Sequence, residues 1–309
     1  MKIFTNQRHK YTYPVVTMGT FDGVHLGHQK LLKVLKTRAN KKNGTSIVIT
    51  YFHHPLETLH NKTYPYLLTE RNRKEKLLKK YGADIVLYLD FNREMAGMSA
   101  PDFLKEVFID AICAKEIVVG YDTHFGKNRE GNFKLIKKYE GVYNYKTDII
   151  KPKYINNKIV SSSFIREMIK DGDIDDVHEY LGRNYCVMGK VISGIKLGRK
   201  IGFPTINVEP TDPNKLLPAN GVYLSKVKIN DKNLWALTNI GKRPTISHDS
   251  DRKLETYIIG FQGNLYGSEV KVSLYRRFRN ERKFDNIEKL QQAIQADLEK
   301  AKQIIKSEF

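Results

Sequence analysis

The chain has 309 residues, and 40% of them are hydrophobic, which is enough apolar material for two packed domains. Its formal net charge of +19 is spread over both halves and favours polyanionic ligands such as nucleic acid, anionic membrane or polyphosphate. No apolar run approaches the roughly 18 residues of a membrane-spanning helix, no signal peptide is visible, and two isolated cysteines exclude a disulfide framework or a zinc cage. We therefore expect a cytoplasmic protein.

The first part of the chain alternates short apolar runs with helical patterns. Strands are expected at residues 15–19, 46–52, 85–89 and 116–120, and helices at residues 27–39, 70–80 and 100–112. The strands are apolar throughout, so both of their faces must be covered. This pattern predicts an α/β fold with a doubly wound parallel sheet.

After about residue 183 the pattern changes to short strands separated by Gly, Pro and Asn. These runs span residues 185–192, 222–229, 234–240, 254–260 and 270–275, and they indicate an antiparallel barrel or sandwich. A helical pattern at residues 286–305 carries one apolar stripe, which we expect to pack on that barrel. We predict two domains, residues 1–183 and 184–309.

Residues 19–28 read Gly-Thr-Phe-Asp-Gly-Val-His-Leu-Gly-His and lie between a strand and a helix. A glycine-rich turn at a helix N-terminus offers backbone N–H groups and a positive dipole end to an anion. His25 and His28 project to similar sides, and Gly27 permits close approach of a ligand. Two alternatives stay open: a plain strand–turn–helix junction, and a zinc pair, although no Glu follows His25 and no third ligand is evident.

Two later segments also suit nucleotide binding, the first through phosphate and the second through a ribose hydroxyl, an amide or a metal ion. Ser161, Ser162 and Ser163 can cap a helix that begins near residue 164, and Arg166 then completes a phosphate clamp. Asp122 follows the strand at residues 116–120, which places it at the ligand edge of a parallel sheet, unless it is simply a turn residue.

A second glycine-rich segment, residues 189–207, interleaves four glycines with Lys196, Arg199 and Lys200. Such loops bind phosphates but also occur as ordinary surface turns. Thr205 and Asn207 are two apart, so they face the same side of an extended chain. Their hydroxyl and amide oxygens suit Mg²⁺.

The first of these segments resembles the His-x-Gly-His signature of nucleotidylyltransferases, in the form found in the FMN adenylyltransferase module of prokaryotic FAD synthetases. Residues 53–55 stand where that family has Pro-His-Pro, with His53 in place of the first proline. Residues 120–126 resemble its Gly-x-Asp/Asn-x-x-Phe-Gly loop, although Thr123 and His124 depart from it. Residues 161–166 resemble its Ser-Ser-Thr-x-x-Arg motif.

Residues 198–207 resemble the riboflavin kinase signature Gly-x-x-x-Gly-Phe-Pro-Thr-x-Asn. Further segments of that family follow in order at residues 218–223, 239–245, 254–256 and 265–267. Glu255 stands at the place of the family's catalytic base, and Tyr257 replaces a histidine that usually follows it. The two resemblances together cover roughly residues 14–305, in the order of the bifunctional enzyme.

The resemblance implies an N-terminal nucleotidylyltransferase domain and a C-terminal six-stranded antiparallel β-barrel with a terminal helix. It implies phosphorylation of riboflavin to FMN and adenylylation of FMN to FAD, with pyrophosphate released. ATP with Mg²⁺ is the co-substrate of both reactions, and the flavins are substrates and products.

The resemblance also implies roles for particular residues. The expected catalytic residues are His25, His28 and Glu255. ATP is expected to bind in the first domain at Gly19, Phe21, Asp22, Gly27, Asp122, Ser162, Ser163 and Arg166, and in the second at Gly194, Lys196, Gly198, Lys200 and Pro204. Flavin is expected to bind at His54, Pro55, Phe125, Arg243 and Arg279, and the metal at Thr205 and Asn207.

Two alternatives remain. One is an enzyme in which only one activity is retained, and the departures at His53, Thr123 and His124 favour the kinase because they fall in the first domain. The other is a nucleic-acid-binding regulator, suggested by the charge of +19. The sequence shows no basic stripe with interleaved aromatic residues on one element, so we expect no nucleic-acid partner and no membrane partner.

Overall fold

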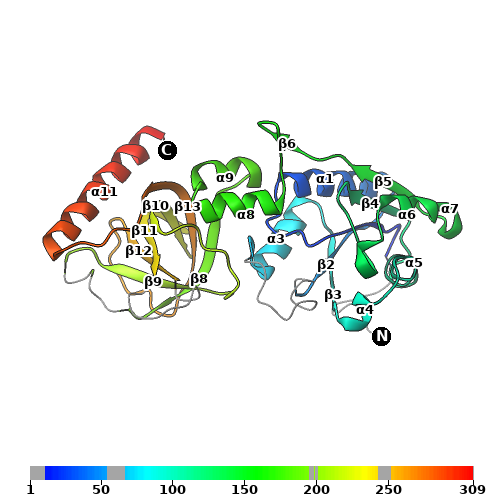
Figure 1. The fold of residues 1–309 in the computed structure, drawn as a ribbon, viewed down its shortest axis with the longest axis horizontal. Helices are drawn as coiled ribbons and strands as arrows, with labels where there is room; N and C mark the ends of the chain where they lie inside the picture. Colours follow the sequence, from blue (N-terminus) through cyan, green and yellow to red (C-terminus); the bar gives the residue numbers. More distant parts are fainter. Residues whose placement is uncertain (1–10, 54–66, 195–197, 199–200, 243–251, 309) are drawn as a thin grey trace. The chain divides into compact units, whose positions relative to one another are not determined.

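A computed structural model describes residues 11–53, 67–194, 198, 201–242 and 252–308. The chain divides into two compact units, Met1–Ser162 and Ser163–Phe309, which we describe separately (Figure 1). Within the described residues, no helix combines the length and the apolar character that crossing a membrane requires.

The first unit is built on a parallel sheet. Its strands are β1 (Val15–Met18), β2 (Ser46–Tyr51), β3 (Ile85–Leu89), β4 (Glu116–Gly120) and β5 (Lys146–Ile150), in the order β3-β2-β1-β4-β5. The four strands expected from the sequence are confirmed. Strand β5 was not expected, because it lies at an edge and its polar first half lacks the apolar run of a central strand.

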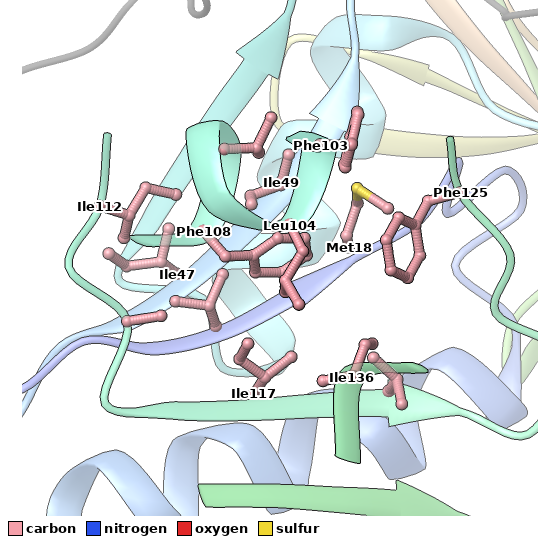
Figure 2. Packing of buried hydrophobic residues seen from close by; sticks show 14 of the residues in the cluster. Met18, Ile47, Ile49, Phe103, Leu104, Phe108, Ile112, Ile117, Phe125 and Ile136 are labelled. Atoms are coloured by element: carbon pink, nitrogen blue, oxygen red, sulfur yellow. The ribbon is translucent and has the colours of Figure 1, made fainter. Parts of the chain in front are cut away.

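Helices cover both faces of this sheet. α1 (Leu26–Lys41) and α3 (Arg71–Tyr81) pack on one core, and α5 (Ala100–Phe103), the π-helix η1 (Leu104–Asp110) and α6 (Phe133–Lys138) pack on the other. Successive residues of each central strand enter opposite cores, as Val15 and Val16 do. Figure 2 shows the second core, where Phe108 lies among Ile47, Ile49 and Ile117. The doubly wound α/β fold is thus confirmed.

Short elements complete the first unit. They are α4 (Arg93–Ala96), η2 (Lys127–Arg129), α7 (Glu140–Tyr143), β6 (Tyr154–Ile155) and β7 (Lys158–Ile159). The last two form an antiparallel pair.

The second unit is a closed antiparallel barrel with helices. Its strands are β8 (Cys186–Ile192), β9 (Thr205–Pro210), β10 (Gly221–Ile229), β11 (Lys232–Lys242), β12 (Arg252–Ile258) and β13 (Glu269–Arg279), in the order β10-β11-β12-β9-β8-β13. Pairing of β13 with β10 closes the ring. The sequence allowed a barrel or a sandwich, and closure confirms the six-stranded barrel.

The terminal helix α11 (Ile287–Glu308) packs on the barrel through the middle of its apolar stripe (Figure 1). Leu298 and Ala301 pack with Val222 and Leu237 of the strands. Ile287, at the start of the stripe, is half exposed. The expected packing of this helix is therefore confirmed for its middle and not for its first turn.

Helices α8 (Ser162–Asp171) and α9 (Ile174–Leu181) are joined to the barrel. The Arg277 guanidinium donates hydrogen bonds to the carbonyl oxygens of Asp171 (3.0 Å) and Asn220 (2.9 Å). The Arg277 backbone N–H donates to the Asp175 carboxylate at 2.8 Å. The compact units divide after Ser162, the first residue of α8, whereas the predicted domain boundary follows Arg183; that boundary stays a prediction.

Candidate functional site

Strands β1 and β4 are neighbours, yet the helices that follow them cover opposite faces of the sheet. α1 follows β1 on one face, and α6 follows β4 on the other. This is a topological switch point, and ligands of such sheets bind outside the carboxyl ends of the strands there. The turn at residues 19–25 and the loop at residues 121–126 both begin at this edge, so the sheet brings two predicted segments together.

His25 and His28 lie at the start of α1, as expected. His25 is the N-cap residue, and its Nδ1 accepts a hydrogen bond from the His28 backbone N–H at 3.3 Å. Because Nδ1 is the acceptor, the neutral ring carries its proton on Nε2. The two imidazoles stack with centroids 3.6 Å apart. The pair is thus held as one unit by the helix terminus.

The turn before these histidines has an unusual backbone. Phe21 (φ 49°), Gly23 (φ 84°) and Val24 (φ 39°) all lie in the left-handed region, which side chains other than glycine enter at a cost. The Phe21 ring is buried in the core beside α1. A Cβ at Gly27 would approach the His25 imidazole to 3.1 Å, so glycine leaves room for that ring.

Asp22 was expected to bind ATP, but its carboxylate is buried and accepts hydrogen bonds from the backbone N–H groups of Leu68 and Thr69 at 3.0 Å. The Asp22 carbonyl oxygen accepts a hydrogen bond from the Ser162 hydroxyl at 2.8 Å. These hydrogen bonds indicate that Asp22 holds the shape of the turn. Direct contact of Asp22 with ATP stays a prediction.

The loop after β4 carries two residues that were predicted to bind ligands, and the structure exposes one and buries the other. Asp122 is exposed at the switch point, as expected. Phe125 is buried, and its ring packs with Phe103 at 5.5 Å and Phe108 at 6.3 Å (Figure 2). Phe125 is therefore a core residue in this structure. Because its ring is buried, the structure offers no support for the predicted contact with flavin.

Other predicted residues of this site are placed less directly. Ser163 and Arg166 lie in the first turns of α8 and belong to the second compact unit. His54 and Pro55 lie outside the described residues. Their roles stay predictions.

Lys74 was missed by the sequence analysis. It lies on α3, and its ammonium donates hydrogen bonds to the Thr20 carbonyl oxygen and the Thr50 hydroxyl, both at 3.2 Å. Burial lowers its pKa to about 8. The spacing along the helix could have indicated that Lys74 is buried. Lys74 precedes the buried Leu77 and Leu78 by three and four residues and so shares their helix face.

In the barrel, the register aligns the predicted kinase residues. Glu255 of β12 stands directly opposite Asn207 of β9, and Tyr257 stands opposite Thr205. Directly opposed residues share one face of a sheet. Glu255 is exposed while its neighbour Thr256 is buried, so this face points away from the barrel interior. The predicted acid and oxygen ligands therefore lie together.

Asn239 of β11 stands opposite Glu255 on its other side. The sequence analysis placed Asn239 in a family segment but gave it no role. Its place beside Glu255 follows from the pairing of β11 with β12, which cannot be read from the linear sequence. An amide and a carboxylate side by side on one face can hold each other's orientation.

Two glycines bring the loop before β9 close to these ligands. A Cβ at Gly194 would lie 2.1 Å from the Asn207 Nδ2, and one at Gly198 would lie 3.2 Å from the Thr205 Oγ1. Pro204 is exposed just before Thr205. Lys196, Lys200 and Arg243 lie outside the described residues.

The donor set of Thr205 and Asn207 fits Mg²⁺ as part of a shared site. Mg²⁺ prefers oxygen ligands and usually keeps waters and substrate phosphates around it. A hydroxyl and an amide oxygen suit that role, and the glycines let the backbone of the preceding loop lie close against both side chains. Within the described part of the chain, no cluster of three or more His, Cys, Asp or Glu residues forms an all-protein metal site.

An open depression of about 410 Å³ lies between the start of β9 and α11. Phe203 lines it, together with Gln291 and Gln295 of the helix. The Phe203 ring contacts the Tyr257 ring at 5.6 Å, so the depression adjoins the ligand face of the barrel. Arg279, expected to bind flavin, pairs with the Asp297 carboxylate of α11 at 2.8 Å and thereby fastens the helix.

Comparison with known proteins decides the family. The FAD synthetase family model matches residues 7–164, and the riboflavin kinase family model matches residues 181–305. The chain is 38% identical over 288 residues to the bifunctional riboflavin kinase/FMN adenylyltransferase of Buchnera aphidicola from Schizaphis graminum, covering 92% of this chain and 91% of the relative. The chain belongs to the bifunctional riboflavin kinase/FMN adenylyltransferase family.

Other members of this family are similar over the same extent. Those of Haemophilus influenzae and Escherichia coli are 33% and 32% identical, over 94% and 92% of this chain and 94% and 90% of theirs. A solved structure described as a macrolide-efflux protein from Streptococcus pneumoniae is 29% identical, with a TM-score of 0.87, and covers 98% of this chain and 97% of its own. The fold, the enzyme class and the part in flavin-cofactor biosynthesis are thus confirmed for this family member.

Proposed function

We propose that the barrel transfers the γ-phosphate of ATP to riboflavin, and that the sheet site joins the resulting FMN to the adenylyl group of a second ATP. The observation that carries the proposal is the placement of both motif sets. His25 and His28 follow β1 and Asp122 follows the neighbouring β4 at the switch point, and Glu255 stands opposite Asn207 in a strand pair.

In the kinase reaction, Glu255 accepts the proton of the ribityl 5′-hydroxyl. The hydroxyl oxygen then forms a bond to the γ-phosphorus of ATP, and the bond from that phosphorus to the bridging oxygen breaks, so ADP leaves. Thr205 and Asn207 hold the phosphates and the Mg²⁺ of ATP, and that ion neutralises phosphate charge when bound. The exposure of Glu255 and its place beside Asn207 support this role.

In the adenylyl transfer, an oxygen of the FMN phosphate forms a bond to the α-phosphorus of ATP. The bond from that phosphorus to the β-phosphate breaks, and pyrophosphate leaves with the bonding electrons. No general base is needed, because the FMN phosphate is already ionised. His25 and His28 stabilise the charge that grows on the phosphates, and the N-terminus of α1 adds its dipole. Asp122 and Ser162 of the first unit are proposed to hold this ATP, and the roles of Ser163 and Arg166 stay predictions.

The depression beside Phe203 is the proposed place for the flavin ring of the kinase substrate. It is lined by an aromatic ring and by helix α11, and it adjoins the face that carries Glu255 through Tyr257. Ligand sites combine an apolar wall with a few polar groups in this way.

We further propose a cytoplasmic enzyme whose partners are riboflavin, FMN and ATP rather than nucleic acid or membrane. Two free cysteines, Cys113 and Cys186, suit a reducing compartment. The positive charge of the chain suits polyphosphate ligands.

Two substitutions test both reactions. Glu255→Gln keeps the side-chain shape and removes the base, so FMN formation from riboflavin should fall by about 10²- to 10⁴-fold while FAD formation from supplied FMN continues. His28→Ala should reduce FAD formation by about 10²- to 10³-fold and let FMN accumulate. Flavin products are separated and measured after incubation with ATP and Mg²⁺.

The matched controls are Glu269→Gln on β13 and His178→Ala on α9, because both residues are exposed and lie outside the proposed sites. Neither should change either rate. Undiminished FAD formation by His28→Ala would refute the sheet site, and equal loss of both reactions in Glu255→Gln would refute the division of labour.

A further inference from the structure

Three groups form a closed triangle beneath the turn that precedes the histidines. The Lys74 ammonium donates to the Thr20 carbonyl oxygen and to the Thr50 hydroxyl, each at 3.2 Å. The Thr50 hydroxyl in turn donates to the same Thr20 carbonyl oxygen at 3.2 Å. Helix α3, the end of β2 and the turn after β1 are therefore joined at one point.

The position is unfavourable for a charge. Part of the Lys74 residue reaches the surface, but its ammonium is deeply buried, and burial lowers its pKa to about 8. The Asp22 carboxylate opposes this shift, and the positive charge of Arg71 adds to it. A pKa below that of a free lysine means that the folded protein binds the proton less tightly than the unfolded chain does. The contribution of Lys74 to the free energy of unfolding therefore rises between about pH 8 and 10.5 and is least favourable at neutral pH.

The Lys74 ammonium is one of two hydrogen-bond donors to the Thr20 carbonyl oxygen. Without it, the Thr50 hydroxyl still donates to the Thr20 carbonyl oxygen. The face of α3 that carries Lys74 also carries Leu77 and Leu78, so an apolar side chain of similar length would suit the helix. Replacing buried charges by apolar groups of similar size is often neutral or stabilising. The charge at this place calls for a reason other than stability.

That reason lies in the turn. The Thr20 carbonyl belongs to the peptide plane that leads into Phe21, whose φ of 49° is left-handed. Such a conformation persists only where its surroundings hold it. The same turn ends at His25 and the N-terminus of α1, which form the proposed phosphate site. A cation that holds the Thr20 carbonyl thus sets the backbone of the phosphate site and places positive charge beneath it.

We propose that Lys74 is a positioning residue for adenylyl transfer, whose ammonium holds the turn at residues 19–25 in the form that binds the polyphosphate of ATP. This inference rests on the proposed function of the sheet site. The role belongs to the charge and its hydrogen bonds, not to the packing of the side chain.

The test compares Lys74→Met, which keeps an apolar chain of similar length, with Lys74→Arg, which keeps the charge. The control is Lys76→Met, an exposed lysine on the same helix. FAD formation from FMN is measured as ATP is varied, and thermal unfolding is followed by circular dichroism. Lys74→Met should lower kcat/KM for ATP by about ten- to 100-fold, because small misplacement of reacting groups has effects of this size. Its unfolding midpoint and its phosphorylation of riboflavin should not fall.

Lys74→Arg should recover most of the lost rate, and Lys76→Met should behave as the unaltered protein. Wild-type kcat/KM in Lys74→Met would overturn the inference, as would a loss that Lys74→Arg does not recover. If Lys74→Met does not fold, the test rests on the rate of FAD formation by Lys74→Arg divided by that of the unaltered protein. This ratio should rise as the pH passes through about 8, where lysine loses its proton and arginine does not; a flat ratio overturns the inference.

The same assay with His28→Ala separates this inference from the function on which it rests. If His28→Ala abolishes FAD formation and Lys74→Met does not, only the role of Lys74 fails. If neither affects it, the proposed sheet site fails.

Discussion

At the scale of single residues, the position of the Asn207 side chain depends on the glycine that lies against it, Gly194. The Asn207 side chain is buried and lies so close to the Gly194 backbone that a Cβ would come within 2.1 Å of its Nδ2. Gly194 does not have a left-handed backbone, so alanine is conformationally acceptable there. Any effect of alanine must therefore come from displacing Asn207.

Gly194→Ala should accordingly lower FMN formation from riboflavin by about tenfold or more, because the displaced amide belongs to the proposed phosphate and Mg²⁺ site. FAD formation from supplied FMN should continue unchanged. Gly141→Ala serves as the control, because a Cβ at Gly141 meets nothing within 4 Å. Full kinase activity in Gly194→Ala would show that Asn207 is not needed where the structure places it.

At the scale of elements, helices α8 and α9 are fastened to the barrel by Arg277 of β13. The guanidinium bonds to backbone carbonyls at Asp171 and Asn220, and the Arg277 backbone bonds to Asp175. A Cβ at Gly172 would approach the same guanidinium to 2.5 Å, so the turn between the helices is shaped around it. These contacts explain why the second compact unit begins before the barrel strands.

Arg277→Ala should therefore lower the free energy of unfolding of the second unit by about 2–3 kcal/mol, because two charge-assisted hydrogen bonds are lost. The only tryptophan of the chain, Trp235, lies on β11 and reports on this unit by its fluorescence. Urea unfolding followed at Trp235 measures the change, with Lys232→Ala as an exposed control on the same strand. An unchanged midpoint in Arg277→Ala would contradict the fastening role.

At the scale of the whole molecule, the proposed reactions are divided between the two units. His25, His28 and Asp122 belong to the first, and Glu255 and Asn207 belong to the second. FMN is a complete, soluble product of one reaction and the substrate of the other. The chemistry therefore does not require that both active sites stand in the same chain.

A mixture of Glu255→Gln and His28→Ala proteins should thus convert riboflavin to FAD, although neither protein does so alone. The measurement is the yield of FAD from the mixture compared with each protein separately. A mixture that accumulates FMN without FAD would show that the product of one chain does not serve another, and that the two sites are coupled.

Much of this arrangement could be predicted from local pattern. The apolar runs identified the central strands, and the helix-start position of His25 and His28 followed from the turn before them. Strand β5 escaped, because an edge strand needs no apolar run. The hydrogen bonds of the Asp22 carboxylate were not foreseen, because the amides that it binds lie more than 40 residues away in the chain.

The elements, their order and the chemical types at each site thus follow from the amino-acid sequence, since these depend on neighbours along the chain. The strand pairs were known only from the folded chain, and with them the positions of β1 beside β4 and of Asn207 and Asn239 on either side of Glu255. The same holds for the place of Lys74 beneath the turn and of Phe125 in the core. Pairing and burial depend on how distant segments pack, and local periodicity carries no information about that.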